Sequence, residues 1–185
     1  PGEAAVIAEE LVVADRMGLG SHGSVRVGEY LDVARSGKVV PGAPCTVARE
    51  TAASAVVDGG MNFGQVVGRF ALEVASRKAR ESGTGCVVTR RSHHLGRVGH
   101  WAEQAIAAGL ASIHFTNVVS RPLVAPHGGA QGRFGTNPIC YGFPTAEGDP
   151  IIWDIGTSKI MHAEVLLARR LGRELPEGAA FGPNS

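Results

Sequence analysis

Apolar residues recur along the chain at two different spacings, which predict helices in some segments and strands in others. Spacing of three and four residues is typical of a helix with one buried face, and short apolar runs are typical of strands. Helical spacing covers residues 3–17, 24–36 and 65–81, the segment around 98–105, and a last segment after Thr157. Short apolar runs cover residues 53–57, 86–89, 110–116, 139–143 and 151–155. Because helices and strands alternate, the pattern predicts an α/β layer structure.

Glycine, proline and hydroxyl residues indicate where these elements end. Gly37 stands where a left-handed residue would end the second helix, and Asp58-Gly59-Gly60 predicts a turn that ends the first strand. Thr157 is expected to cap the last helix. Residues 117–138 contain several Pro and Gly without periodicity, which predicts a long loop of the kind that is often functional in compact domains.

The composition is that of a globular protein, with 44% hydrophobic residues, 19% charged residues and a net charge of +1. So small a charge does not attract a polyanion, which argues against a nucleic-acid partner. No apolar run is long enough to span a bilayer, and no charged-then-apolar segment resembles a signal peptide. Cys45, Cys86 and Cys140 are odd in number and widely spaced, as expected of reduced thiols. We therefore expect a cytoplasmic protein that binds neither nucleic acid nor membrane.

Residues 18–23 read Gly-Leu-Gly-Ser-His-Gly, which matches the GxGxxG pattern of dinucleotide-binding loops. A Rossmann loop of that kind needs a strand before it and a helix that begins within it. Here a predicted helix precedes the motif. Any dinucleotide is therefore expected to bind in some way other than the Rossmann arrangement.

Ser21, His22 and Arg26 place a hydroxyl, an imidazole and a guanidinium near the start of a predicted helix. An arginine there is suited to hold a carboxylate through two parallel hydrogen bonds, which a lysine cannot do. The alternative is structural, with Ser21 as a helix N-cap, His22 as a loop residue and Arg26 as a solvated charge. The spacing alone favours the structural alternative.

The segment Ser92–Arg97 follows one predicted strand and precedes a predicted helix. A histidine at the carboxyl end of a strand is well placed for acid–base chemistry, and an unperturbed pKa of about 6.5 suits proton transfer at neutral pH. Zinc bound by His93, His94 and His100 is one alternative, although no Cys or carboxylate is clustered nearby. A histidine held only by backbone hydrogen bonds is the other.

Taken in order, eight segments resemble the malate/L-lactate dehydrogenase family, which includes ureidoglycolate, sulfolactate and Δ1-piperideine-2-carboxylate enzymes. No single segment is specific, but together they cover almost the whole chain in register. The segments are Asp15–Gly18, Ser21–Arg26 (SHGSVR), Gly37–Pro41 (GKVVP), Ser92–Arg97 (SHHLGR), Val124–Gly129 (VAPHGG), Gly135–Pro138 (GTNP), Trp153–Ser158 (WDIGTS) and Leu175–Gly178 (LPEG). The resemblance favours the functional interpretation of both histidine-containing loops.

The resemblance implies an α/β, mixed-sheet, non-Rossmann malate/L-lactate dehydrogenase-like fold, assembled as a homodimer with the active site between domains. Residues 1–60 would form an amino-terminal helical part that binds substrate. Residues 61–185 would form an α/β part that binds the nicotinamide cofactor. Family members begin about one helix earlier and continue well beyond residue 185, so the resemblance implies a truncated form of this fold.

The site residues of the family are carried over by position. The resemblance implies that His94 donates and accepts the proton, that Ser21 and His22 form a Ser-His pair, and that Arg26 and Thr136 contact the substrate. Glu164 matches loosely an acidic partner of that pair. The cofactor contacts implied are His94, Leu95, Gly96, Arg97, Val98, Asp154, Ile155, Gly156, His162 and Ala163. No metal ligand is implied.

The implied activity is reversible hydride transfer between NAD or NADP and a small 2-hydroxy acid or 2-oxo acid. The protein must then deliver a proton to the carbonyl oxygen and neutralise the carboxylate, for which a histidine and an arginine are suited. The choice between NAD and NADP stays open because Trp153–Gly156 departs from the commoner apolar-Asp-x-Ala pattern. The alternative is a catalytically inactive fragment or interaction module derived from such an enzyme.

Overall fold

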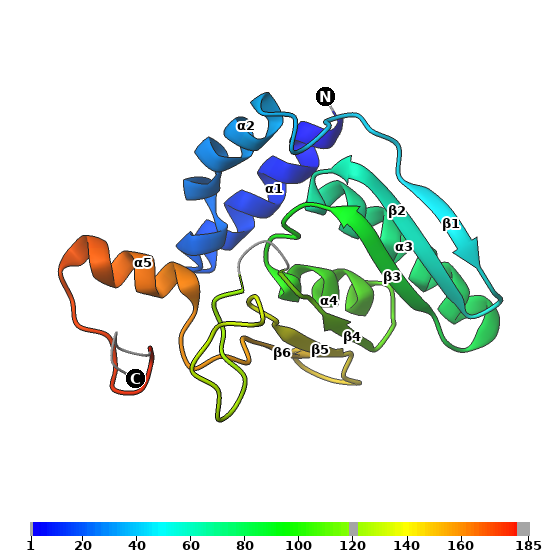
Figure 1. Cartoon of the computed structure of the whole chain (residues 1–185). Coiled ribbons are helices and arrows are strands. Elements are labelled where there is room, and N and C mark those ends of the chain that lie inside the picture. The colour runs from blue at the N-terminus through cyan, green and yellow to red at the C-terminus, as the bar shows by residue number, and fades with distance from the viewer. Residues whose placement is uncertain (1, 119–121, 181–185) are drawn as a thin grey trace.

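Two three-stranded sheets with helices between them make up the body of the chain, and a computed structural model describes residues 2–118 and 122–180 (Figure 1). In the first sheet β1 is antiparallel to β2 and β2 is parallel to β3, so the sheet is mixed. The second sheet is antiparallel throughout. The strands are β1 (Thr46–Glu50), β2 (Ser54–Asn62), β3 (Cys86–Ser92), β4 (Ser112–Phe115), β5 (Ile139–Phe143) and β6 (Ile151–Ile155). The predicted mixed α/β architecture is confirmed.

The helices lie close to their predicted positions. They are α1 (Gly2–Arg16), α2 (Val27–Arg35), α3 (Gly64–Ser82), α4 (Val98–Ala107) and α5 (His162–Leu171), with two short 3-10 turns, η1 (Gly20–His22) and η2 (Ser24–Arg26). Figure 1 shows α1 and α2 side by side next to the start of α3, whereas α5 extends away from the sheets. Within the described ranges no helix has the length and apolar content needed to cross a membrane.

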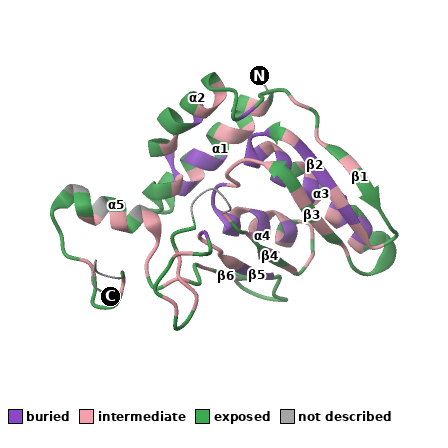
Figure 2. Cartoon of the chain, in the orientation of Figure 1, coloured by how far each residue is buried: buried purple, intermediate pink, exposed green. Residues whose placement is uncertain are grey.

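Helix α3 covers one face of the first sheet because its apolar residues recur every three or four positions. Val67, Ala71 and Val74 pack against Ala55 and Val57 of β2. Burying a valine side chain contributes roughly 1.5–3 kcal/mol, so this cluster is a main source of stability for the first sheet. Figure 2 shows buried residues along β2, α3 and α4.

Helix α4 covers the second sheet and also contacts α3. Val98, Trp101 and Ala102 form a buried cluster with Cys140 of β5. The indole ring of Trp101 lies so close to Gly68 that a Cβ there would be 2.6 Å from a ring carbon. Any side chain at position 68 would therefore push α4 away from α3.

The turn predicted at Asp58-Gly59-Gly60 is wrong, because β2 continues through these residues to Asn62. Gly60 and Met61 both have positive φ, and the pairing with β3 shifts between Asp58 and Asn62, as in a β-bulge. Glycine adopts this conformation without strain, so the strand bends there and does not end. The predicted division after residue 60 stays a prediction and falls inside β2. Strand β1 was not predicted.

The predicted cap at Thr157 is also wrong, because α5 begins at His162. The Glu164 side chain accepts a hydrogen bond from the backbone N–H of Met161 at 3.1 Å and so caps the first turn of α5. The Thr157 hydroxyl donates to the carbonyl oxygen of Asn137 at 3.3 Å and so ties the β6 end to the loop before β5. A hydroxyl residue predicts a cap only when the backbone turns into a helix directly after it.

One face of the second sheet carries large apolar residues that nothing in the described chain covers. Ile113, Tyr141 and Trp153 are paired across the three strands and therefore share a face, and Phe115 follows two residues after Ile113 on β4. The exposed fractions are 54% for Ile113, 75% for Phe115 and 59% for Trp153. Cys140 lies on the opposite face, beneath α4.

We expect the 185-residue chain to self-associate through this face, because apolar patches beyond roughly a few hundred Å² usually bind another surface. The apparent mass should rise with concentration in sedimentation velocity experiments. Phe115→Lys combined with Trp153→Lys should reduce the association, whereas Val88→Lys, an exposed valine on the first sheet, should not. A mass that stays monomeric at all concentrations would contradict the expectation.

Candidate active site

The candidate site lies at the carboxyl ends of the two parallel strands, β2 and β3. The carbonyl oxygen of Asn62 accepts a hydrogen bond from the N–H of His93 at 3.2 Å, so the loop after β3 begins beside the loop after β2. A Cβ on Gly64 would be 2.1 Å from the carbonyl oxygen of His94. The absence of a side chain at position 64 therefore allows the His93-His94 backbone to pack on the first turn of α3.

The His94 ring joins the loop after β3 to the amino-terminal helices. Its Nδ1 lies 2.9 Å from the hydroxyl of Tyr30 on α2 and accepts the N–H of Gly96 at 3.3 Å. The His22 ring stacks on the His94 ring, with 5.6 Å between centroids and 26° between planes. The structure thus brings together two of the predicted catalytic residues, which are 72 positions apart in the sequence.

Ser21 and Arg26 lie in the same loop as His22. Ser21 Oγ is 2.9 Å from His22 Nδ1, so the predicted Ser-His pair is present as a contact. Arg26 donates from Nε to the Ser21 carbonyl oxygen at 2.7 Å and from Nη1 to Glu29 at 2.6 Å. Two nitrogens of the guanidinium are thereby held, and Nη2 is left for a ligand. The alternative role of Ser21 as an N-cap is wrong, because η1 and η2 are preceded by Leu19 and Gly23.

Burial keeps both imidazoles uncharged near neutral pH. Desolvation, and after it the positive charge of Arg26, lower the pKa of His94 to about 3. Desolvation and Arg26 also lower the pKa of His22, while the carboxylate of Asp154 opposes them. His94 therefore departs from the unperturbed pKa that its residue type implies. A ligand carboxylate placed beside Arg26 would raise the pKa of both rings.

The predicted residues on the second sheet are mostly held by internal contacts. Asp154 Oδ2 accepts the N–H of Gly99 at 2.7 Å at the start of α4, where a carboxylate is favourable. Thr136 accepts the N–H of Val118 through its carbonyl oxygen at 3.1 Å. Ile155 pairs with Ile139 in the sheet. The contacts described for Thr136 do not reach His94, so the structure groups only part of the predicted set.

Gly156 and the first residues of α5 lie beyond the second sheet. A Cβ on Gly156 would be 2.4 Å from Sδ of Met161, so this glycine allows the chain to fold back on itself before α5. His162 is the first residue of α5 and is half-buried. The Ala163 side chain lies outside the described part of the structure. The carboxylate of Glu164 caps α5 and was predicted, loosely, as a partner of the Ser-His pair.

Three residues of the predicted cofactor run are buried in the protein. Gly96 has a φ of 75°, and a Cβ there would be 1.9 Å from Oε1 of Glu10. Arg97 forms an ion pair with Glu103 at 2.5 Å, and Val98 belongs to the α4 core. These residues therefore shape the loop, and only His94 and Leu95 of the run are partly exposed.

Two functional candidates were not predicted from the sequence, and both are polar residues buried beside Tyr30. Gln65 is completely buried and donates from Nε2 to the Tyr30 hydroxyl at 2.8 Å. Glu10 is 3% exposed and accepts the N–H of Arg97 at 3.1 Å. A signal for Glu10 is present in the sequence, because it stands with Leu11 in the apolar stripe of the first helix. An acidic residue in such a stripe is buried and therefore has a structural or chemical reason to be there.

The zinc alternative lacks a ligand cluster. Across residues 2–118 and 122–180, no three His, Cys, Asp or Glu side chains form a group that could hold a metal ion. His93 meets the Tyr30 ring edge-on, and His100 lies 2.7 Å from the Gln104 amide. His93 and His94 thus both contact Tyr30, whereas His100 contacts Gln104.

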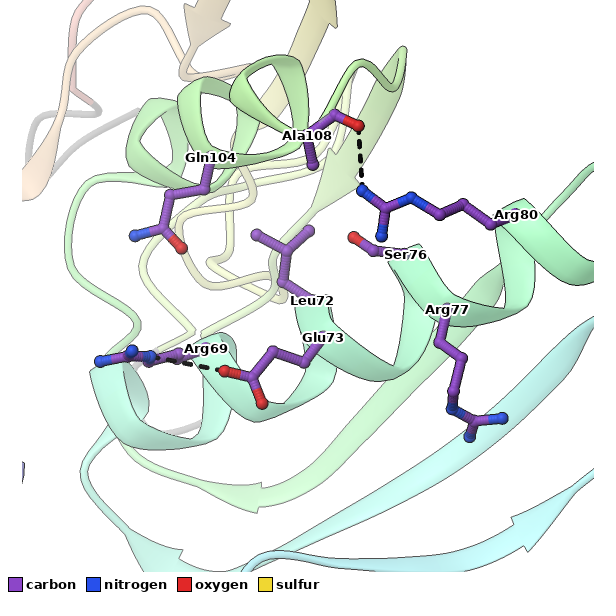
Figure 3. Close-up of a pocket in the computed structure, with 8 residues that line it drawn as sticks. All are labelled: Arg69, Leu72, Glu73, Ser76, Arg77, Arg80, Gln104 and Ala108. Carbon is purple, nitrogen blue, oxygen red and sulfur yellow. Dashed lines mark hydrogen bonds and ion pairs between the residues drawn. The ribbon is translucent and has the colours of Figure 1, made fainter.

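A surface hollow of about 350 Å³ lies away from these residues, between α3 and α4 (Figure 3). The Arg80 guanidinium closes one end by donating to the carbonyl oxygen of Ala108 at 3.0 Å. The residues that line it are Arg69, Leu72, Glu73, Ser76, Arg77, Arg80, Gln104 and Ala108. None of them was predicted as a site residue.

Comparison with known proteins gives a consistent set of relatives. A family described as malate/L-lactate dehydrogenase matches residues 1–185. Malate dehydrogenase of Pyrococcus abyssi is 41% identical over 179 residues, which cover 97% of this chain and 49% of that protein. Hydroxycarboxylate dehydrogenase B of Escherichia coli strain K12 is 37% identical over 182 residues, covering 98% of this chain and 50% of that protein.

Solved structures agree with the sequence relatives. Sulfolactate dehydrogenase from Methanocaldococcus jannaschii superposes with a TM-score of 0.88 at 35% identity, covering 96% of this chain and 51% of that chain. This chain therefore spans about half the length of the curated relatives that it matches.

Glu10 makes the stability of the fold depend on pH. Desolvation raises the pKa of Glu10 from 4.5 to about 7, so the folded protein holds this proton more tightly than the unfolded chain does. The stabilisation is complete below pH 4.5 and is lost as pH rises to about 7. The shift corresponds to about 3 kcal/mol. We expect Glu10→Gln to remove this pH dependence and to be the more stable protein at pH 8, as measured by urea unfolding.

The exposed neighbour Glu9 provides the control, because Glu9→Gln makes the same change of charge on the same helix outside the core. Its unfolding free energy should follow that of the unmodified protein at every pH. Equal pH dependence in the Glu10 and Glu9 variants would show that the buried carboxyl does not cause it.

Proposed function

The chain belongs to the malate/L-lactate dehydrogenase family, and from this membership and the site geometry we propose that it is part of an NAD- or NADP-dependent 2-hydroxyacid dehydrogenase. The substrate is a small 2-hydroxy acid or the corresponding 2-oxo acid. The observation that carries the proposal is the stacking of His22 on His94 beside the Arg26 loop. The proposal includes a cytoplasmic homodimer without a nucleic-acid or membrane partner.

The residues present fit a nicotinamide cofactor in part. Asp154 on β6 and Gly156 just after this strand are exposed, and Leu95 is half-exposed beside His94. The residues that would contact the cofactor are His94, Leu95, Asp154, Ile155, Gly156, His162 and Ala163. Gly96, Arg97 and Val98 would shape the loop beneath it. When bound, the nicotinamide supplies or accepts the hydride at C2 of the substrate. The nearby relatives include proteins named for malate, hydroxycarboxylate and sulfolactate.

Arg26 orients the substrate through its carboxylate. A guanidinium fits a carboxylate with parallel hydrogen bonds, and here two of its nitrogens are already fixed by Ser21 and Glu29. Nη2 is free to bind, and a two-nitrogen grip requires Arg26 to release one of its present partners. Thr136 provides a second contact to the substrate in this proposal.

His94 moves the proton at the oxygen on C2. Its Nδ1 is occupied by Tyr30 and Gly96, so Nε2 is the nitrogen left for that oxygen. In reduction a doubly protonated His94 releases the Nε2 proton to the oxygen and keeps the proton on Nδ1, and in oxidation Nε2 of that neutral form takes the proton back. The substrate carboxylate offsets the charge of Arg26, which is the second cause of the low pKa of His94. Binding of an oxo acid is thereby coupled to proton uptake, with Ser21 and His22 packed against the same ring.

The proposed activity is tested with the product of the complete reading frame that contains this chain. We expect loss of NADH or NADPH absorbance when a 2-oxo acid from a panel of oxaloacetate, pyruvate and sulfopyruvate is added. Turnover is expected with at least one acid, and the reverse reaction with the corresponding hydroxy acid. Absence of turnover with every acid of the panel and with both cofactors would contradict the proposal. It would favour the alternative of an inactive derivative or interaction module.

The role of His94 is tested by comparison with its neighbour. His94→Ala should lower kcat about 10²–10⁴-fold, the contribution of a positioned acid or base. Because a general acid must be protonated, kcat/KM for reduction should fall as pH rises, and His94→Ala should abolish that slope. His93→Ala should keep the slope, since the His93 ring contacts the edge of Tyr30. If the two variants behave alike, the proton has been assigned to the wrong imidazole.

A further inference from the structure

We infer that Gln65 is a positioning residue that acts through the Tyr30 hydroxyl to hold neutral His94, in the ligand-free protein, with its proton on Nε2. The inference concerns three groups from α3, α2 and the loop after β3, which meet in the interior beside the candidate site. Its consequence for catalysis rests on the proposed function, whereas the tautomer itself does not.

The backbone N–H of Gly96 fixes the role of Nδ1. This N–H donates to His94 Nδ1 at 3.3 Å, and a backbone N–H has no lone pair with which to accept. This contact favours Nδ1 as the unprotonated nitrogen of the neutral ring, and a Tyr30 hydroxyl that donates to Nδ1 favours the same tautomer. The Tyr30 hydroxyl, 2.9 Å from the same Nδ1, is then the donor of that hydrogen bond.

The Tyr30 hydroxyl can donate to His94 only if nothing else takes its single proton. Gln65 meets that condition, because its Nε2 donates to the Tyr30 oxygen at 2.8 Å. Tyr30 is 4% exposed and Gln65 is completely buried, so water does not compete for either group. The hydrogen bonds therefore run in one direction, from Gln65 to Tyr30 to His94.

The Gln65 amide presents its NH2 end to Tyr30. The Gln65 Oε1 is consequently left buried without a partner in the described structure. Such an unsatisfied acceptor is unfavourable, which indicates that the orientation is imposed by its neighbours.

The direction of these hydrogen bonds determines whether His94 presents a hydrogen-bond donor or an acceptor to a substrate. With Nδ1 as acceptor, the neutral ring carries its proton on Nε2, the nitrogen left for the oxygen on C2. The ring then presents an N–H donor to the carbonyl oxygen of a 2-oxo acid before any further proton is taken up. The two hydrogen bonds from Tyr30 and Gly96 also oppose rotation of the imidazole ring, which would exchange the positions of Nδ1 and Nε2.

The test uses the complete gene product with ¹⁵N-labelled histidine, and His94 is assigned by comparison with His94→Gln. At pH 7.5 we expect the chemical shift of an unprotonated Nδ1 and a protonated Nε2. Gln65→Met removes the donor to Tyr30 at nearly constant volume and should raise the fraction of His94 protonated on Nδ1. Tyr30→Phe should do the same. The expected kinetic effect of Gln65→Met is a kcat about tenfold lower at unchanged KM.

A double variant that reverses the direction of these hydrogen bonds gives the most discriminating measurement. In the double variant Glu10→Gln with Gln65→Glu, a carboxylate replaces the amide beside Tyr30 and accepts the hydroxyl proton, so His94 should protonate Nδ1. Gln104→Met is the matched control, because Gln104 pairs with His100 on α4, and it should change neither the His94 tautomer nor kcat.

A protonated Nδ1 in the unmodified protein, or a His94 tautomer unchanged by Gln65→Met, Tyr30→Phe and the double variant, would overturn the inference. Failure of the proposed function can be told apart from failure of this inference. If the proposed function is wrong, the unmodified protein shows no turnover, but the His94 tautomer can still be measured and still depends on Gln65 and Tyr30.

Discussion

The packing of the His93-His94 backbone on the first turn of α3 is the constraint on which the site depends. Position 64 has no room for a side chain, because a Cβ there would overlap the carbonyl oxygen of His94. The close contact brings the carboxyl end of β3 to the start of α3 and places the His94 ring within reach of Tyr30. Since α2 directly follows the loop that carries His22, the same contact also sets the two imidazoles against each other.

Desolvation is the dominant electrostatic effect in this region, and it favours the uncharged form of every titratable group that it reaches. It raises the pKa of Glu10 and Tyr30 and lowers the pKa of His22 and His94. The interior beside the site therefore holds neutral groups joined by hydrogen bonds, with the charge of Arg26 and the Arg97–Glu103 ion pair at its edges. In such surroundings the charge of an incoming anion meets little competition, and the pKa of each neighbouring group responds strongly to it.

The fold was largely predictable because its helices and strands carry clear periodicity. The stripe on α3 and the apolar runs of β5 and β6 placed these elements within a residue of their observed bounds. The interpretation failed at Asp58-Gly59-Gly60, where glycine permits a bulge as readily as a turn and only the pairing with β3 distinguishes the two. In the site, residue type indicated His94 and Arg26, whereas Gln65 and Glu10 depend on contacts between helices distant in sequence. Burial likewise moved the pKa of His94 far from its reference value.

Trp101 contacts both α3 and the loop after β3. Its ring lies against Gly68 of α3, and its indole N–H donates to the carbonyl oxygen of Leu95, the residue after His94. One side chain thus closes the helical layer and also holds the loop. Motion of the loop is therefore tied to undocking of α4, a sub-global opening that is rarer and slower than the fraying of an ordinary surface loop. The backbone amides around His94 belong to the same cooperative unit as the core between the sheets.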